Sequence, residues 1–194
     1  MQDVSLNATD QRSLNLMIEQ SEIISNINTI RDMFRGRGFS WNRFRGNAIA
    51  NVIAYYLENH LPNDIKLVKL AWVEGCATEF DHIIVSKNAE PSGFTDAYDK
   101  DQVKLVIEIK ASGVFFKSEE VKARLIGMFD KWKKDTQKPA LYLSVWEAKA
   151  HAKIIQEALG KDVAFLLQIE GEEPTLYEWE RFLDRVDTLL KPNL

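Results

Sequence analysis

One segment, residues 103–110, constrains the fold of this 194-residue chain more than any other. Its sequence, Val-Lys-Leu-Val-Ile-Glu-Ile-Lys, is rich in apolar, mostly β-branched residues and lacks Gly and Pro, which predicts a buried β-strand. Because side chains alternate along a strand, Glu108 and Lys110 lie on the same face near its end. Burying a charge is costly unless it is paired or holds a metal. We therefore expect a polar site at the end of this core strand.

A second acidic residue, Asp81, stands at the polar start of another strand-like segment, Asp-His-Ile-Ile-Val. If the two strands are neighbours, Asp81 and Glu108 converge with Lys110 beside them. Two nearby carboxylates repel unless a cation lies between them, and Mg²⁺ prefers carboxylate and water oxygens. Such an ion can polarise a phosphodiester, while Lys110 can orient or deprotonate the attacking water. Glu79 precedes Asp81 by two residues, so it shares the strand face and is a further candidate metal ligand.

Asp81 followed by Glu108-Ile109-Lys110 at a strand end resembles the Asp…(Asp/Glu)-x-Lys motif of the PD-(D/E)XK nuclease-like superfamily. The chain is especially similar to bacterial members that read Gly…Leu…Leu-Pro, then a polar-x-Asp-Ile-Ile strand, then Val-Ile-Glu-x-Lys. The resemblance covers roughly residues 44–146. It implies an α/β fold with a restriction-endonuclease-like core, in which a mixed central sheet is flanked by helices in the order α-β-β-β-α-β, here preceded by an N-terminal helix.

The resemblance also implies a function, namely divalent-metal-dependent hydrolysis of DNA by a nuclease of a restriction or defence type, with RNA left open as a substrate. Asp81, Glu108 and Lys110 would be the catalytic residues. Asp81, Glu108 and Glu79 would bind Mg²⁺ or Mn²⁺. The sequence departs from the superfamily in its first core helix, where the position of an assisting Glu falls near Ala50 or Asn51. We expect Asn51 to reach a metal-bound water or a phosphate instead.

Hydrophobic periodicity and helix signals give an element order that fits this core. We expect helices over 10–34, 46–61, 118–134 and 147–159, strands over 66–75, 81–85, 103–110, 140–146 and 163–169, and a polar loop over 86–102. Thr175 and Glu178 form a capping box that predicts a final helix. We divide the chain into an N-terminal helix with a basic loop, residues 1–43, and a nuclease-like domain, residues 44–194.

The apolar residues of the first helix recur at sevens, threes and fours, forming a narrow stripe of Leu16, Ile23, Ile27, Ile30 and Phe34. Two interpretations stay open. The helix packs on its own domain, which is the commoner case, or it joins two copies of the chain into a homodimer.

The most basic stretch of the chain spans residues 31–45, which we expect to form a loop because Gly36 and Gly38 interrupt it. Its arginines are interleaved with aromatic residues, a pattern that can bind phosphates and stack on bases. The candidate DNA contacts are Arg35, Arg37, Arg43 and Arg45, together with Asn51. The alternative is a linker whose aromatic residues fill the core.

Composition excludes several other classes. A net charge of −4 argues against a protein coated in nucleic acid but leaves room for a local basic groove. Cys76 is the single cysteine, so an internal disulfide is excluded. The sequence shows neither an apolar run of membrane-spanning length nor a signal peptide, so we expect a cytoplasmic protein without membrane contacts. The histidines lack metal-ligand spacing, and no phosphate-binding glycine motif occurs.

The charged residues on the two strands also allow an interpretation without catalysis. Asp81, Glu108 and Lys110 can form a satisfied ion cluster at a strand edge. The protein would then be a non-catalytic nucleic-acid-binding module that uses the basic stretch, or an assembly subunit that dimerises through its first helix.

Overall fold

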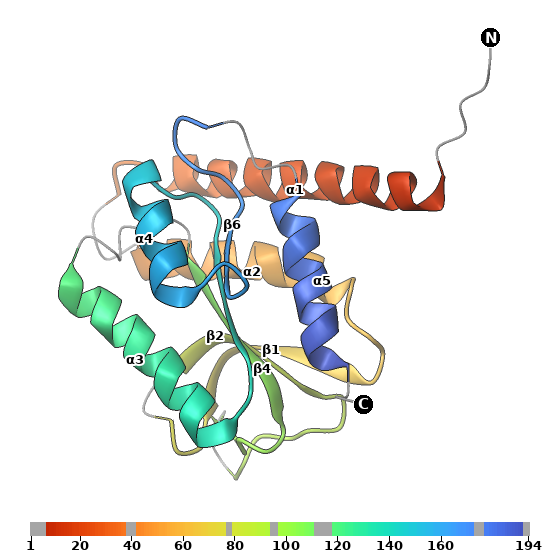
Figure 1. The fold of residues 1–194 in the computed structure, drawn as a ribbon, viewed down its shortest axis with the longest axis vertical. Helices are drawn as coiled ribbons and strands as arrows, with labels where there is room; N and C mark the ends of the chain where they lie inside the picture. Colours follow the sequence, from red (N-terminus) through yellow and green to blue (C-terminus); the bar gives the residue numbers. More distant parts are fainter. Residues whose placement is uncertain are drawn as a thin grey trace.

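The computed structural model describes residues 7–37, 42–76, 79–93, 97–110, 118–172 and 177–191. A central twisted sheet carries helices on both faces (Figure 1). The helices are α1 (Ala8–Met33), α2 (Asn42–Glu58), α3 (Glu119–Thr136), α4 (Lys149–Leu159) and α5 (Glu178–Leu190), and the strands are β1 (Ile65–Val73), β2 (Glu79–Ser86), β3 (Ala97–Tyr98), β4 (Val103–Lys110), β5 (Ala140–Ser144) and β6 (Ala164–Leu166). None of the helices in these ranges is long and apolar enough to cross a membrane.

The six strands form one sheet in the order β3-β1-β2-β4-β5-β6. β2 is antiparallel to both β1 and β4, whereas the remaining neighbours run parallel. The sheet is therefore mixed, and the predicted α/β fold is confirmed. β2 and β4 are direct neighbours whose register pairs His82 with Ile107. Asp81 and Glu108 consequently stand opposite each other at the next position.

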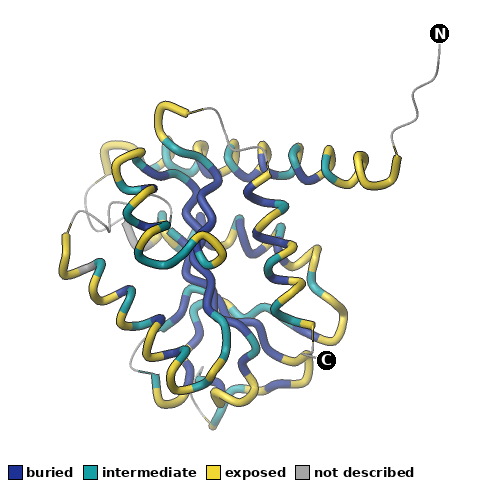
Figure 2. Tube along the Cα trace, in the orientation of Figure 1, coloured by how far each residue is buried: buried dark blue, intermediate teal, exposed yellow. Residues whose placement is uncertain are grey.

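The central strands consist largely of buried residues (Figure 2), and apolar clusters lie on both faces of the sheet. Helices α1, α2 and α5 cover one face, where Leu105 and Ile107 of β4 and Leu141 and Leu143 of β5 lie. Helices α3 and α4 cover the other face, which includes Val106, Ala140 and Tyr142. Burial on both faces explains why β4 reads as an almost continuous apolar segment. It also makes the two charged residues near its end exceptional.

Helix α1 packs on the domain that contains the sheet. Leu16, Ile23 and Ile27 belong to the same buried cluster as residues of α2 and α5. Gln20 is buried in this stripe, where its amide nitrogen donates to the Leu167 carbonyl and its amide oxygen accepts from the Trp179 backbone amide. The first of our two interpretations is therefore what the structure shows. A homodimer through α1 and the division of the chain at residue 43 stay predictions.

Several element bounds differ from those expected. Helix α2 begins at Asn42, four residues before the expected start, so Arg43 and Arg45 are helical and a loop reaching residue 45 was wrong. The expected polar loop over 86–102 contains the short strand β3, which pairs with the end of β1. Helix α4 begins at Lys149, which leaves Glu147 between β5 and the helix. Thr175 of the predicted capping box lies outside the described residues.

Strand β1 changes the face on which its side chains lie. Leu70 has a φ of 51°, an uncommon left-handed conformation for a residue with a branched side chain. Ile65 and Leu67 before it pack in the core under α2 and α5, whereas Ala71 and Val73 after it pack in the core under α3. In the register between β1 and β2, Leu70 lies opposite Asp81. The irregularity thus coincides with the point where β2 presents its acidic side chain.

Candidate active site

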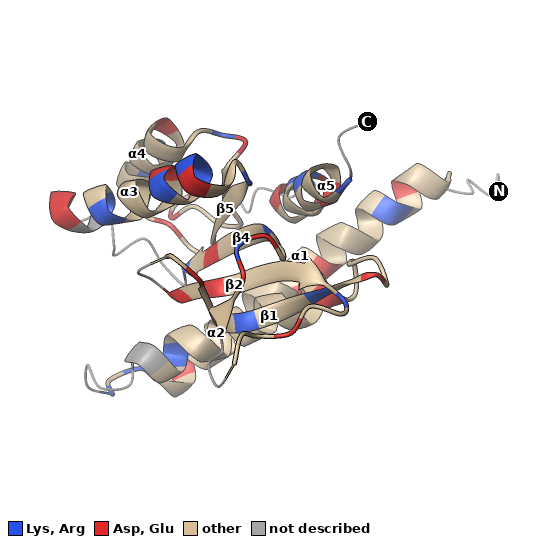
Figure 3. Ribbon diagram, turned by 90° about the horizontal axis from the view of Figure 1, so that it is seen from below, with Lys and Arg blue, Asp and Glu red and all other residues tan. Residues whose placement is uncertain are grey.

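Asp81 lies near the start of β2, and Glu108 and Lys110 lie at the end of the antiparallel strand β4, so the three residues meet at one edge of the sheet. Acidic segments of β2 and β4 lie side by side in Figure 3. Lys110 Nζ lies 3.2 Å from Asp81 Oδ2 and also donates a hydrogen bond to Glu108 Oε1. Asp81 Oδ2 accepts a second hydrogen bond, 2.8 Å long, from the Ile109 backbone amide. The structure therefore brings the three predicted residues together, while their catalytic and metal-binding roles stay predictions.

Burial changes the proton affinity of this site. Glu108 is only 9% exposed, and burial raises the pKa of its carboxyl group, aided by the Asp81 charge and opposed by Lys110. For Lys110, burial acts to lower the pKa, but the charges of Glu108 and Asp81 outweigh it and the pKa is raised. Lys110 thus stays a cation that balances two carboxylates. Breaking such a pair leaves an uncompensated charge in a dry environment.

The oxygen atoms at this site suit a hard cation. Glu108 Oε2 is buried and has no hydrogen-bond partner among the described residues. Mg²⁺ is commonly held by one or two carboxylates, with water and substrate phosphates as its other ligands. Asp81 and Glu108 fit that donor set. In the described ranges no group of three or more His, Cys, Asp or Glu side chains is placed to hold a metal. Glu79 is half-buried and paired with Trp72 of β1, and its role as a metal ligand stays a prediction.

Two buried polar residues of β5 lie beside the predicted site. Tyr142 is in register with Glu108, and Ser144 with Lys110, so both share the strand face of the site. Ser144 Oγ donates a 2.8 Å hydrogen bond to Oε2 of Glu147. Glu147 is fully buried, and burial raises the pKa of its carboxyl group to about 7. Tyr142, Ser144 and Glu147 therefore continue the row of polar side chains from β4 onto β5, on the side of β4 away from Asp81.

Glu147 was not singled out from the sequence, where it was assigned to the first turn of a helix. Like Glu108, it is an acidic residue at the end of a largely apolar, strand-like segment, which is a signal that the sequence offers. Its backbone is held by a 2.9 Å hydrogen bond to the Gln168 carbonyl and a 2.8 Å hydrogen bond from the Glu170 amide. Nδ1 of His151 is 3.6 Å from Oε1 of Glu147, too far for a normal hydrogen bond.

The predicted nucleic-acid contacts are more dispersed. Arg35 and Arg37 are exposed in the turn after α1, and Arg45 is half-buried on α2. The side chain of Arg43 lies outside the part that the structure describes. Asn51 is exposed on α2. Their DNA-binding roles stay predictions.

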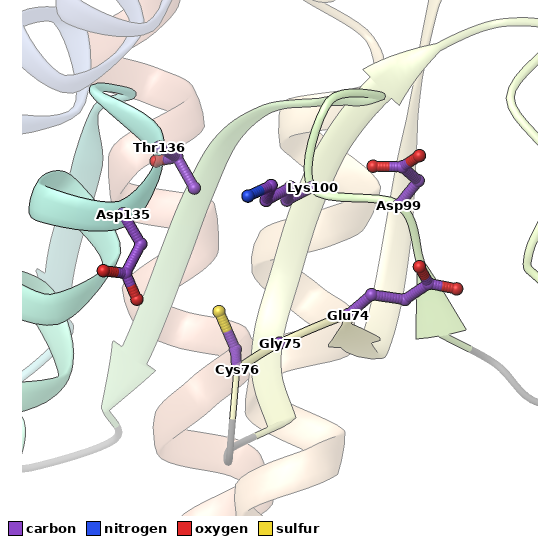
Figure 4. A pocket seen from close by; sticks show the side chains of 7 residues that line it. All are labelled: Glu74, Gly75, Cys76, Asp99, Lys100, Asp135 and Thr136. Carbon is purple, nitrogen blue, oxygen red and sulfur yellow. The ribbon is translucent and has the colours of Figure 1, made fainter.

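A pocket of about 420 Å³ lies elsewhere, between the end of β1, the segment after β3 and the end of α3 (Figure 4). It is lined by Glu74, Gly75, Cys76, Asp99, Lys100, Asp135 and Thr136. Its three carboxylates and one lysine give it a negative balance, which repels a phosphate backbone. It contains none of the residues predicted for the active site, so we do not place a nucleic-acid substrate there.

No protein-family model matches the sequence, and no curated protein matches it. Solved structures do match. NucC of P. aeruginosa ATCC27853 in its cAAA-bound form has a TM-score of 0.54 at 15% identity, covering 76% of this chain and 69% of that chain. NucC of E. coli MS115-1 in its cAAA-bound form has a TM-score of 0.58 at 14% identity, covering 84% and 74%. Its apo form has a TM-score of 0.50 at 14% identity, covering 86% and 90%.

At these identities the similarity shows the fold alone. The chain is structurally similar to the NucC nucleases and has their restriction-endonuclease-like PD-(D/E)XK fold. The fold inferred from Asp81, Glu108 and Lys110 is thereby confirmed.

Proposed function

We propose that this protein is a divalent-metal-dependent nuclease that hydrolyses phosphodiester bonds in DNA. The observation that carries the proposal is the convergence of Asp81, Glu108 and Lys110 at the ends of two adjacent strands. Two carboxylates and an ammonium group that are largely removed from water carry a desolvation cost, and such clusters are concentrated at functional sites. The fold shared with NucC raises the weight of this interpretation.

Each residue has a separate task in this proposal. Asp81 is held in place by the Ile109 amide, so one of its oxygens is already oriented before any ligand arrives. Glu108 presents the oxygen Oε2, which has no hydrogen-bond partner among the described residues. Asp81 and Glu108 together would hold Mg²⁺ or Mn²⁺. Lys110 can donate hydrogen bonds to a phosphate oxygen or to the attacking water. The bound ion would supply Lewis-acid polarisation of the phosphodiester.

The test is calorimetric titration of Mg²⁺ and Mn²⁺ into the wild-type protein and into Asp81→Ala. We expect binding to the wild type and a loss of at least about 10-fold in affinity in the variant, because one of two charged ligands is removed. Asp184→Ala is the matched control, since Asp184 is an exposed acid of α5 whose carboxylate pairs with Arg12 and not with a residue of the predicted site. It should bind metal like the wild type. Equal metal affinity in Asp81→Ala and the wild type would contradict the assigned site.

Cleavage is measured on supercoiled and linear DNA and on RNA, with either metal or with EDTA. The reactions are run with and without cAAA, because two matching NucC structures hold that ligand. The proposal requires metal-dependent cleavage of DNA by the wild type and its loss in Asp81→Ala. Metal-independent DNA binding without cleavage under all these conditions would favour a non-catalytic nucleic-acid-binding protein.

A further inference from the structure

Arg31 and Trp146 contact each other beside the predicted active site, and neither residue has a role in the proposed reaction so far. The guanidinium carbon of Arg31 lies 5.1 Å from the centroid of the Trp146 ring, a cation–π arrangement. Arg31 belongs to the last turn of α1, and Trp146 follows β5. Both side chains are half-buried, so the pair lies at the protein surface.

The backbone places this pair next to Lys110. The Val145 amide donates a 3.0 Å hydrogen bond to the Lys110 carbonyl, and Trp146 is the next residue along the chain. Ser144, two residues before Trp146, is in register with Lys110 in the sheet. The ring that supports Arg31 is therefore anchored to the same strand end that presents the predicted active-site lysine.

Within the described ranges, no carboxylate forms an ion pair with Arg31. Arg12 and Arg181 form ion pairs with Asp184 and Glu178, whereas the ion pairs among the described residues include none with Arg31. The hydrogen bond that Arg31 makes is with a neutral amide, from Nη1 to Asn28 Oδ1 at 3.2 Å. A guanidinium group carries five N–H donors, so others remain for a ligand. Its fork geometry matches a phosphate group.

We propose that Arg31, which lies over the Trp146 ring, binds a backbone phosphate of the DNA strand next to the phosphodiester that is cleaved at Asp81, Glu108 and Lys110. The inference rests on the proposed nuclease function and deepens it. An arginine that forms no ion pair among the described residues, beside a phosphodiester site, attracts the neighbouring phosphate. The contact with the indole ring restricts the Arg31 side chain before the phosphate binds, so less conformational freedom is lost on binding. Contacts of this kind position a strand without reading its sequence.

A purely structural role predicts different results. Arg31 lies at the C-terminal end of α1, where a cation interacts favourably with the helix dipole, and its contact with Trp146 joins α1 to the sheet. If that were its whole role, replacing Arg31 would lower the melting temperature and leave the salt dependence of DNA binding unchanged.

The experiment measures binding of a fluorescently labelled 20-base-pair duplex in EDTA, by anisotropy, over a series of KCl concentrations. Binding without metal separates this contact from the chemistry. For Arg31→Ala we expect about 10-fold weaker binding and a slope of log K against log[KCl] that is smaller by about 1, which corresponds to one lost phosphate contact. Arg12→Ala, which removes an arginine from the opposite end of α1, should leave both quantities unchanged.

Two further variants guard against a folding artefact. Arg31→Lys keeps the charge but loses the planar fork, so we expect it to restore the salt slope and only part of the affinity. Trp146→Phe keeps an aromatic face under Arg31 and should bind more tightly than Trp146→Ala. An unchanged slope and affinity in Arg31→Ala, or a wild type that does not bind the duplex at low salt, would overturn the inference. If Arg31 governs binding but no metal supports cleavage, the proposed nuclease function fails instead.

Discussion

Lys110→Ala is expected to lower metal-dependent DNA cleavage by about 1,000-fold. In this structure the Lys110 ammonium group contacts both acids, and in the proposed reaction it orients the attacking water and stabilises the developing charge. Positioned acid–base and electrostatic groups each contribute about 100- to 1,000-fold or more to rate. The measurement is the initial rate of plasmid cleavage at saturating Mg²⁺.

The same substitution should also destabilise the metal-free protein by roughly 3 kcal/mol, because it leaves a buried carboxylate without its cation. The destabilisation should be smaller at low pH, since Glu108 already has a raised pKa and takes up a proton more readily when Lys110 is absent. Added Mg²⁺ should raise the melting temperature of Lys110→Ala more than that of the wild type, because the ion then replaces the missing charge.

Lys104→Ala is the matched control for these measurements. Lys104 stands on the same strand, near its opposite end, and is half-buried. It should leave cleavage and the response to Mg²⁺ unchanged. A Lys110→Ala protein that cleaves DNA at the wild-type rate would remove the lysine from the mechanism and favour the ion-cluster interpretation.

The elements that could be predicted are those marked by a pattern in their own stretch of sequence. β4 spans Val103–Lys110, the segment expected from the sequence, because an uninterrupted apolar run between polar loops has few other conformations available. The strand alternation that placed Glu108 and Lys110 on one face also holds in the structure. Their meeting with Asp81 required one further assumption, that β2 and β4 are neighbours, and the resemblance to a known fold supplied it.

The parts that were missed depend on contacts between distant segments. β3 has two residues and exists because it pairs with Trp72 and Val73 of β1. The change of face in β1 depends on the backbone of Leu70, whose positive φ no sequence pattern indicates. The early start of α2 was missed because Gly46 was taken as a boundary, whereas the helix continues through it.

The buried state of Glu147 is a further long-range effect, and it leads to a prediction about pH. Glu147 is 0% exposed, and burial raises the pKa of its carboxyl group from 4.5 to about 7. The folded protein thus binds this proton more tightly than the unfolded chain does. The stability gained in this way is fully present below the unfolded pKa of 4.5 and is lost as the pH rises through about 7.

We expect Glu147 to lower the free energy of unfolding by about 3 kcal/mol between pH 4.5 and pH 8, since each unit of pKa shift corresponds to about 1.4 kcal/mol. The measurement is urea denaturation of the wild type and Glu147→Gln across this range. Subtracting the two curves removes the contributions of other titrating groups. The glutamine side chain has no charge to bury, so the variant should lose less stability than the wild type as the pH rises.

Two controls identify the cause of the pH dependence. Ser144→Ala removes the hydrogen bond that favours the charged carboxylate, so the loss of stability should shift to higher pH. Glu157→Gln changes an exposed acid of α4 that pairs with Lys153, and its curve should coincide with that of the wild type. A wild type and Glu147→Gln with parallel stability curves would mean that Glu147 is charged in the folded protein at neutral pH.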